Sequence, residues 1–81
     1  MILQKWNYET HKYEPFESPA EVVLLYSDDM SARVDCANCG TEMHMGDSYT
    51  SRTIHNHIGL GFPVCGDCYE AEAALEEASK K

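Results

Sequence analysis

The chain has 81 residues, a length at which a hydrophobic core alone gives only marginal stability, so a further source of stability is expected. Its 14 acidic residues outnumber its 6 basic ones, for a formal charge of −8, which disfavours binding to nucleic-acid phosphates. No apolar run approaches the roughly 20 residues that span a bilayer, and the start lacks the apolar segment of a secretory signal. We therefore expect one domain, residues 1–81, with no membrane segment, in the reducing cytoplasm.

Residues 1–34 are predicted to form a β-rich part of this domain. Between Leu3 and Phe16, aromatic strand formers flank a polar, turn-prone segment, which predicts a β-hairpin. Pro15 removes a backbone donor, so the second arm should lie at a sheet edge or end there. Residues 21–26 form a short, largely apolar run with two β-branched residues. This run predicts a buried strand, although its periodicity alone does not separate a strand from a short helix.

Two Cys-x-x-Cys pairs are the strongest signal in the sequence. The first pair is Cys36 and Cys39, the second is Cys65 and Cys68, and the chain has no other cysteines. Thiolates at this spacing hold one face of a tetrahedral ion, and two pairs complete a four-cysteine shell. In a reducing compartment such pairs favour a metal over disulfides. The sequence thus predicts one structural Zn²⁺ on these four cysteines, although a tetrahedral thiolate site suits iron as well.

The zinc-binding unit is predicted to span residues 35–81. Gly40 follows the first pair, where a zinc knuckle needs a backbone conformation that side chains resist. Alternating residues predict a strand from Ser48 to His55 and then a return strand. On the return strand one face is apolar and should cover the core, with Ile58, Leu60, Phe62 and Val64. The other face is bare enough for another backbone or a partner to approach, because it carries Gly59, Gly61 and Pro63.

A run of helix formers after the second pair predicts a helix that ends at about Ser79. Cys65 and Cys68 should point the same way from its first turn, where the helix dipole favours thiolates. Its buried side is expected to be thin, with Ala71, Leu75 and Ala78 beside Cys68. Its acidic side chains are expected on a solvated face, namely Glu70, Glu72, Glu76 and Glu77.

Together these elements predict a small α+β fold: an N-terminal β-hairpin and strand, a zinc knuckle, a second β-hairpin and a C-terminal helix. The order of knuckle, hairpin and helix suggests a treble-clef-like zinc finger. Four thiolates leave no open coordination position for water on the metal. The sequence shows no catalytic triad and no pair of catalytic carboxylates, so we expect a protein that is not an enzyme.

Two other chemistries are open to these residues. Cys65 and Cys68 at a helix start have the form of a redox dithiol. However, no βαβ pattern precedes them, and a dithiol there would leave the first cysteine pair without a role. The histidines at positions 44, 55 and 57 could supply a second metal site, although a solvated turn explains His44, His55 and His57 more simply.

The chain resembles small zinc-ribbon or treble-clef proteins encoded by bacteriophages and prophages of Gram-positive bacteria. The resemblance covers nearly the whole chain, through short motifs: Trp6-x-Tyr8, Thr10, Tyr13-x-Pro15, Cys36-x-x-Cys39-Gly40, Gly46-x-x-Tyr49-Thr50-Ser51, Ile54-His55 and Val64-Cys65-x-x-Cys68-Tyr69. It implies zinc on the four cysteines and a small intracellular accessory protein, in the bacterial host's cytoplasm. It does not imply a particular function.

The predicted function is a non-enzymatic, zinc-stabilised module that binds a protein partner, with a host factor during phage development as the candidate. An acidic surface aimed at a basic partner would fit the charge. The alternatives are nucleic-acid binding through the aromatic hairpin, where Lys5, Lys12 and Arg33 are the only local bases, and a thiol redox switch.

Overall fold

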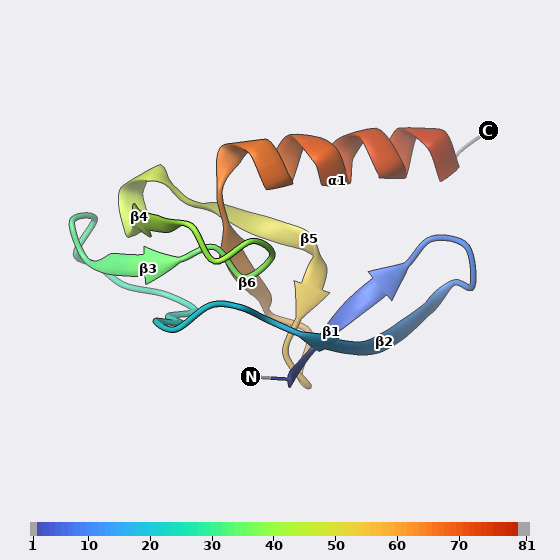
Figure 1. The fold of residues 1–81 in the computed structure, drawn as a ribbon, viewed down its shortest axis with the longest axis horizontal. Coiled ribbons are helices and arrows are strands. Elements are labelled where there is room, and N and C mark those ends of the chain that lie inside the picture. Colours follow the sequence, from blue (N-terminus) through green and yellow to red (C-terminus); the bar gives the residue numbers. More distant parts are fainter. Residues whose placement is uncertain (1, 80–81) are drawn as a thin grey trace.

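The computed structural model describes residues 2–79, so Met1, Lys80 and Lys81, which the predicted domain boundaries include, lie outside it. The described residues form a small α+β structure with antiparallel sheets and a C-terminal helix (Figure 1). In chain order the elements are β1 (Ile2–Asn7), β2 (Lys12–Glu17), β3 (Arg33–Asp35), β4 (Glu42–His44), the 3₁₀ turn η1 (Met45–Asp47), β5 (Tyr49–His55), β6 (Gly61–Val64) and α1 (Gly66–Ser79). The predicted α+β class is confirmed.

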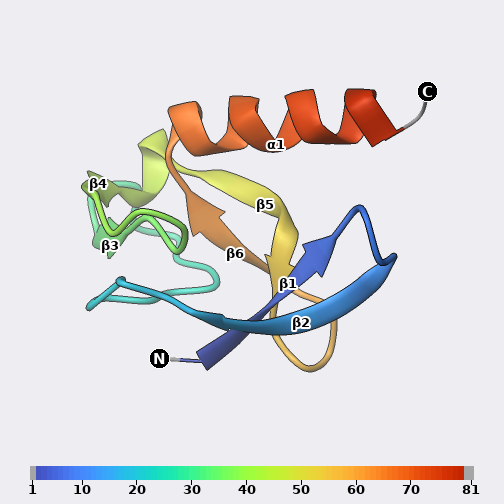
Figure 2. The ribbon, with the colours of Figure 1, turned by 45° about the vertical axis from the view of Figure 1, so that its right-hand side comes forward.

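The strands form a four-stranded sheet in the order β2-β1-β5-β6 and a two-stranded sheet of β3 and β4. Figure 2 shows α1 along one side of the larger sheet, with its C-terminal half above the β1–β2 hairpin. The core lies between the larger sheet and the segment that follows β3. Its buried side chains include Leu3, Cys36, Ile54, Phe62 and Val64. Among the residues described, no helix has both the length and the apolar character needed to cross a membrane.

The predicted N-terminal hairpin is confirmed. β1 pairs with β2 from Ile2↔Glu17 to Asn7↔Lys12. At its turn the Asn7 side-chain oxygen accepts the N–H of Glu9 at 2.8 Å, as Asn commonly does in tight turns. Pro15 lies on β2, which is an outer strand of the sheet, as its missing N–H predicted.

The predicted buried strand at residues 21–26 is wrong, because this segment is irregular and only partly buried. The reason is Asp35, whose buried carboxylate accepts the N–H groups of Glu21 and Val22 at 3.0 and 3.2 Å. These backbone donors, chiefly that of Glu21, hold the pKa of Asp35 below its usual value. A side chain thus satisfies the backbone where a strand neighbour would. Only Val23 of the run packs against the core, and Tyr26 is 77% exposed.

The turn that was predicted to form a knuckle has the expected backbone. The N–H of Gly40 bonds the Cys36 carbonyl at 2.8 Å, and Gly40 has a φ of +80°, a conformation that favours glycine. A Cβ at this position would also lie 3.2 Å from Pro19, so the turn is closely packed. The pairing of β3 with β4 on either side of the knuckle was not predicted.

The second hairpin is confirmed, but its return strand is shorter than predicted. β6 begins at Gly61, so Phe62 and Val64 are buried as expected, whereas Ile58 and Leu60 are 68% and 52% exposed. Their backbone N–H groups bond the side-chain oxygen of Asn56, which keeps them in a turn. The expected close approach at the glycine face is present at Gly61, where a Cβ would lie 2.6 Å from Thr50 Cγ2.

The helix has the predicted extent, but it buries a different side. Ala71 and Ala78 are exposed, and Leu75 is 54% exposed. Glu72, which was expected on a solvated face, is 5% exposed, and Glu76 pairs with Arg52 of β5. The cause is the facing strand, which presents hydroxyl and guanidinium groups to the helix rather than an apolar surface.

Candidate metal centre

The structure brings together the four cysteines that the sequence selects. Cys36 follows β3, Cys39 lies in the knuckle turn, Cys65 follows β6, and Cys68 lies in the first turn of α1. Their Sγ atoms all lie within 4.8 Å of one another. Cys36 is buried and Cys39 is exposed, while the helix-start pair is partly buried. The cluster therefore joins the knuckle, the end of the larger sheet and the start of the helix.

The sulfur positions fit a tetrahedral thiolate site. With a Zn–S bond of about 2.3 Å, the sulfurs of a regular tetrahedron stand about 3.8 Å apart. The Sγ atoms of Cys39 and Cys65 are 3.9 Å apart. No disulfide links the four thiols. The residues present thus form a donor set of the type, number and size that a structural metal ion needs.

Polar groups other than the four thiols point at the sulfurs. The N–H of Cys39 donates to Cys36 Sγ at 3.4 Å, and the Asn38 amide donates to Cys68 Sγ at 3.2 Å. The Thr41 hydroxyl lies 3.1 Å from Cys39 Sγ. Such contacts disperse thiolate charge and orient the ligands. The sequence analysis missed Asn38 and Thr41, although a polar residue inside or just after a Cys-x-x-Cys pair is a usable signal.

Asn38 also connects the cluster to the N-terminal hairpin. Its side-chain oxygen accepts a hydrogen bond from Lys5 Nζ at 3.1 Å, on the opposite end of the amide from Cys68. The same ammonium group lies 4.8 Å from the centre of the Phe16 ring. A dication with four thiolates has a formal charge of −2, so a positively charged lysine that is separated from Cys68 only by the Asn38 amide is electrostatically favourable. This hairpin therefore contributes to the surroundings of the metal centre.

Three of the cysteine thiols differ from one another in acidity. The Thr41 hydroxyl lowers the pKa of Cys39 to about 7, whereas burial raises the pKa of Cys68 to about 12 and also raises that of Cys65. The helix start was expected to favour thiolates, but both of its cysteines are less acidic than Cys39, because burial disfavours their charged form. A bound dication would lower the pKa values of these thiols, since a metal ion deprotonates the thiols that coordinate it.

The histidines do not form a second centre. Within residues 2–79, the four cysteines are the one group of three or more potential ligands close enough to share an ion. His55 Nδ1 lies 3.1 Å from the Tyr13 hydroxyl, and burial lowers the pKa of this histidine. His44 lies on β4 near Asp47, and His57 is exposed.

Comparison with known proteins found no matching family model, no similar curated protein and no similar solved structure.

Proposed function

We propose that this chain is a non-enzymatic protein-interaction module whose fold is held together by one structural Zn²⁺ in a treble-clef-like arrangement. The observation that carries the proposal is the cluster of four cysteine sulfurs, which all lie within 4.8 Å of one another. Four protein ligands leave no position for water or substrate on the metal, which distinguishes structural from catalytic zinc. Cys36, Cys39, Cys65 and Cys68 are the proposed ligands, and the knuckle, β6 and α1 are the elements that zinc would link.

Zinc suits this fold because the helix has little else to hold it. Beyond the cysteines, α1 buries one carboxylate and no large apolar side chain completely. Structural zinc supplies on the order of 10 kcal/mol of binding free energy coupled to folding. The metal would thus stabilise the start of α1 against the knuckle, and the surfaces on either side of α1 would gain a defined relative position.

A protein partner is supported by the surface. The chain has a net charge of −8, and it exposes large apolar side chains, of which Tyr26 at 77% and Ile58 at 68% are the most accessible. Acidic surfaces with accessible apolar groups suit protein partners of opposite charge. The resemblance noted above would make the partner a host factor met in the bacterial cytoplasm during phage development. That part of the proposal rests on the sequence motifs alone.

Two measurements test the proposal. Protein purified without added zinc should contain about one zinc ion per chain, and chelation should abolish its helical circular dichroism. A folded, metal-free preparation would rule out the zinc role. The zinc-loaded chain should also retain a specific protein from a lysate of its natural cells, with the chelated chain as control. No retention at low salt would rule out the interaction role.

A thiol redox switch is the second candidate, favoured by the exposure of Cys39 and its 3.9 Å distance to Cys65 Sγ. A peroxide would take two electrons from these thiolates and be reduced, with two protons, to water; a disulfide would form and zinc would leave. A zinc indicator measures this release. Retention of zinc in a severalfold excess of peroxide would remove the candidate.

Nucleic-acid binding has less support. Lys5 is engaged with Asn38, and Arg33 Nε lies 3.4 Å from both Asp35 and Glu42 carboxylates. Of the three bases of the N-terminal part, only Lys12 is left without such a contact among the described residues. A gel-shift assay at low salt should show no shift with single- or double-stranded DNA or RNA.

A further inference from the structure

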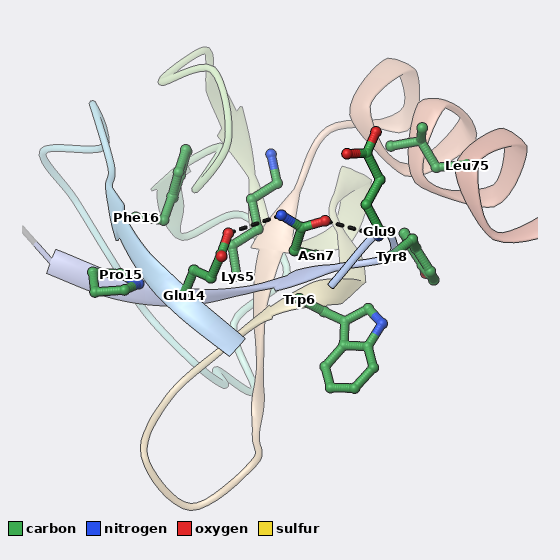
Figure 3. A pocket seen from close by; sticks show the side chains of 9 residues that line it. All are labelled: Lys5, Trp6, Asn7, Tyr8, Glu9, Glu14, Pro15, Phe16 and Leu75. Atoms are coloured by element: carbon green, nitrogen blue, oxygen red, sulfur yellow. Dashed lines mark hydrogen bonds between the residues drawn. The ribbon is translucent and has the colours of Figure 1, made fainter. Parts of the chain in front are cut away.

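A hollow between the N-terminal hairpin and α1 is lined by none of the four cysteines. It has a volume of about 390 Å³ and is open to solvent. We call it the hairpin–helix hollow. It is lined by Lys5, Trp6, Asn7, Tyr8, Glu9, Glu14, Pro15, Phe16 and Leu75 (Figure 3).

Strand register explains why these side chains meet. Lys5 and Asn7 alternate along β1 and therefore share a face, and Glu14 lies directly across from Lys5 on β2. Figure 3 shows Lys5, Asn7 and Phe16 rising from the hairpin on the side of the helix, with the Trp6 ring on the other side. Leu75 closes the hollow from α1, and its side chain is more than half exposed.

The hollow combines apolar walls with uncompensated negative charge. Phe16 and Leu75 supply the walls, and Glu9 and Glu14 supply carboxylates. Within residues 2–79, neither carboxylate has a cation in ion-pair range, and Glu14 is held by the neutral Asn7 amide at 2.9 Å. The one base of the lining, Lys5, is directed at Asn38 and the cysteine cluster.

The carboxylates of the helix near the hollow are already engaged. Burial is the main cause that raises the pKa of the Tyr8 hydroxyl, which lines the hollow; the carboxylates of Glu76 and Glu72 raise it further, and Arg52 lowers it. Glu76 pairs with Arg52, and Glu72 is buried in hydrogen bonds with β5. A cation in the hollow would therefore be bound by the carboxylates of the hairpin.

We propose that the hairpin–helix hollow is a docking site for a basic segment of a partner protein, which places a lysine or arginine between Glu9 and Glu14 and an aliphatic neighbour against Phe16 and Leu75. This inference rests on the proposed interaction function and names the partner's chemistry. Charge complementarity selects the occupant, because a charge-assisted hydrogen bond to a carboxylate favours arginine or lysine. An acidic segment or a bare phosphate would be repelled.

The test is a nuclear magnetic resonance titration of the ¹⁵N-labelled, zinc-loaded chain. The probe is a short peptide that alternates arginine and leucine, and the comparison peptide replaces arginine with glutamate. The arginine peptide should shift the amide signals of the hairpin–helix hollow, foremost Glu9, Glu14 and Leu75, and the glutamate peptide should shift none. Shifts confined to other surfaces, or no binding at low salt, would overturn the docking site.

Two variants with the same charge change sharpen the test. Glu9→Lys places a cation in the hollow and should weaken binding at least about tenfold. Glu77→Lys is the matched control, since Glu77 is exposed and lies two positions from Leu75, roughly 200° around the helix. It should leave the affinity within about twofold, because screening at physiological salt weakens a distant surface charge. Equal losses in both variants would mean general charge attraction and would contradict the hollow.

Leu75→Ser tests the apolar wall, and its exposed position means that folding should be preserved. It should weaken the arginine peptide severalfold and leave zinc content unchanged. If these same signals move with protein concentration in the absence of peptide, a second copy occupies the hollow and the proposal is wrong. A natural partner that is retained by the Glu9→Lys variant as well as by the unmodified chain would overturn the hollow and leave the interaction function intact.

Discussion

Ser51 and Glu72 join the helix to the sheet at a point where neither is open to solvent. The Ser51 hydroxyl donates to the Glu72 carboxylate at 2.5 and 3.1 Å, and the two residues are 3% and 5% exposed. The same carboxylate accepts the N–H of Arg52 at 2.9 Å and the hydroxyl of Thr53 at 3.1 Å. A buried carboxylate with this many donors is a specific lock between α1 and β5.

The first prediction concerns this lock. Glu72→Ala should lower the free energy of unfolding by about 2–3 kcal/mol, because it leaves buried donors of Ser51 and Thr53 without an acceptor. Urea denaturation of the zinc-loaded protein measures the change. Glu70→Ala, on the exposed side of the same helix, is the control and should change stability by less than about 0.5 kcal/mol. Equal effects would show that the lock contributes nothing specific.

The second prediction concerns Asn38. Asn38→Ala removes the donor to Cys68 Sγ and the acceptor for Lys5, so zinc affinity should fall by about 10- to 100-fold. Competition with a chelator of known affinity measures it. Asn38→Asp should weaken zinc binding further, since it replaces the amide donor with a negative charge beside a thiolate. Unchanged affinity in both variants would mean that the amide only fills space.

The third prediction concerns pH. Without metal, the raised pKa values of Cys65 and Cys68 keep both thiols protonated at pH 7, whereas the bound ion requires thiolates. Zinc binding at pH 7 should therefore release at least about two protons, and zinc affinity should fall as the pH is lowered. Calorimetric titrations in buffers of different ionisation enthalpy count the protons. Release of no protons would contradict the acidities described here.

The fourth prediction concerns Gly61. A methyl group there would lie 2.6 Å from Thr50 Cγ2 and 2.7 Å from the Ser51 carbonyl oxygen, so Gly61→Ala should cost about 1–3 kcal/mol of stability. Gly66→Ala is the matched control. Its methyl group would meet only Tyr49, at an ordinary 3.4 Å, and alanine favours the helix, so stability should stay equal or rise slightly. Thermal unfolding of both zinc-loaded variants measures the two changes in stability.

The metal centre could be predicted from the sequence because its signals are local. Within each pair, Cys36 with Cys39 and Cys65 with Cys68, two residues separate the cysteines, so each pair can face one ion whatever the rest of the fold does. The glycine after the first pair and the helix after the second are equally local. The N-terminal hairpin followed from its turn residues for the same reason.

Two predicted strand segments were wrong where a side chain outside the segment accepts hydrogen bonds from its backbone N–H groups. The run at residues 21–26 has strand composition, but Asp35, more than ten residues later, takes its backbone donors. Ile58 and Leu60 alternate with Phe62 as strand residues do, but the Asn56 side chain holds them in an exposed turn. Alternation describes a strand only where a partner strand supplies the hydrogen bonds.

The sequence by itself determined that four cysteines occur as two Cys-x-x-Cys pairs, and it determined which segment forms the helix. Only the tertiary structure decided which face of that helix is buried. A helical periodicity selects apolar residues for burial, and α1 instead buries Glu72, because β5 presents Ser51 and Thr53 to it. The cost of burying a carboxylate depends on donors about 20 residues away, and that information becomes available only when the two elements are in contact.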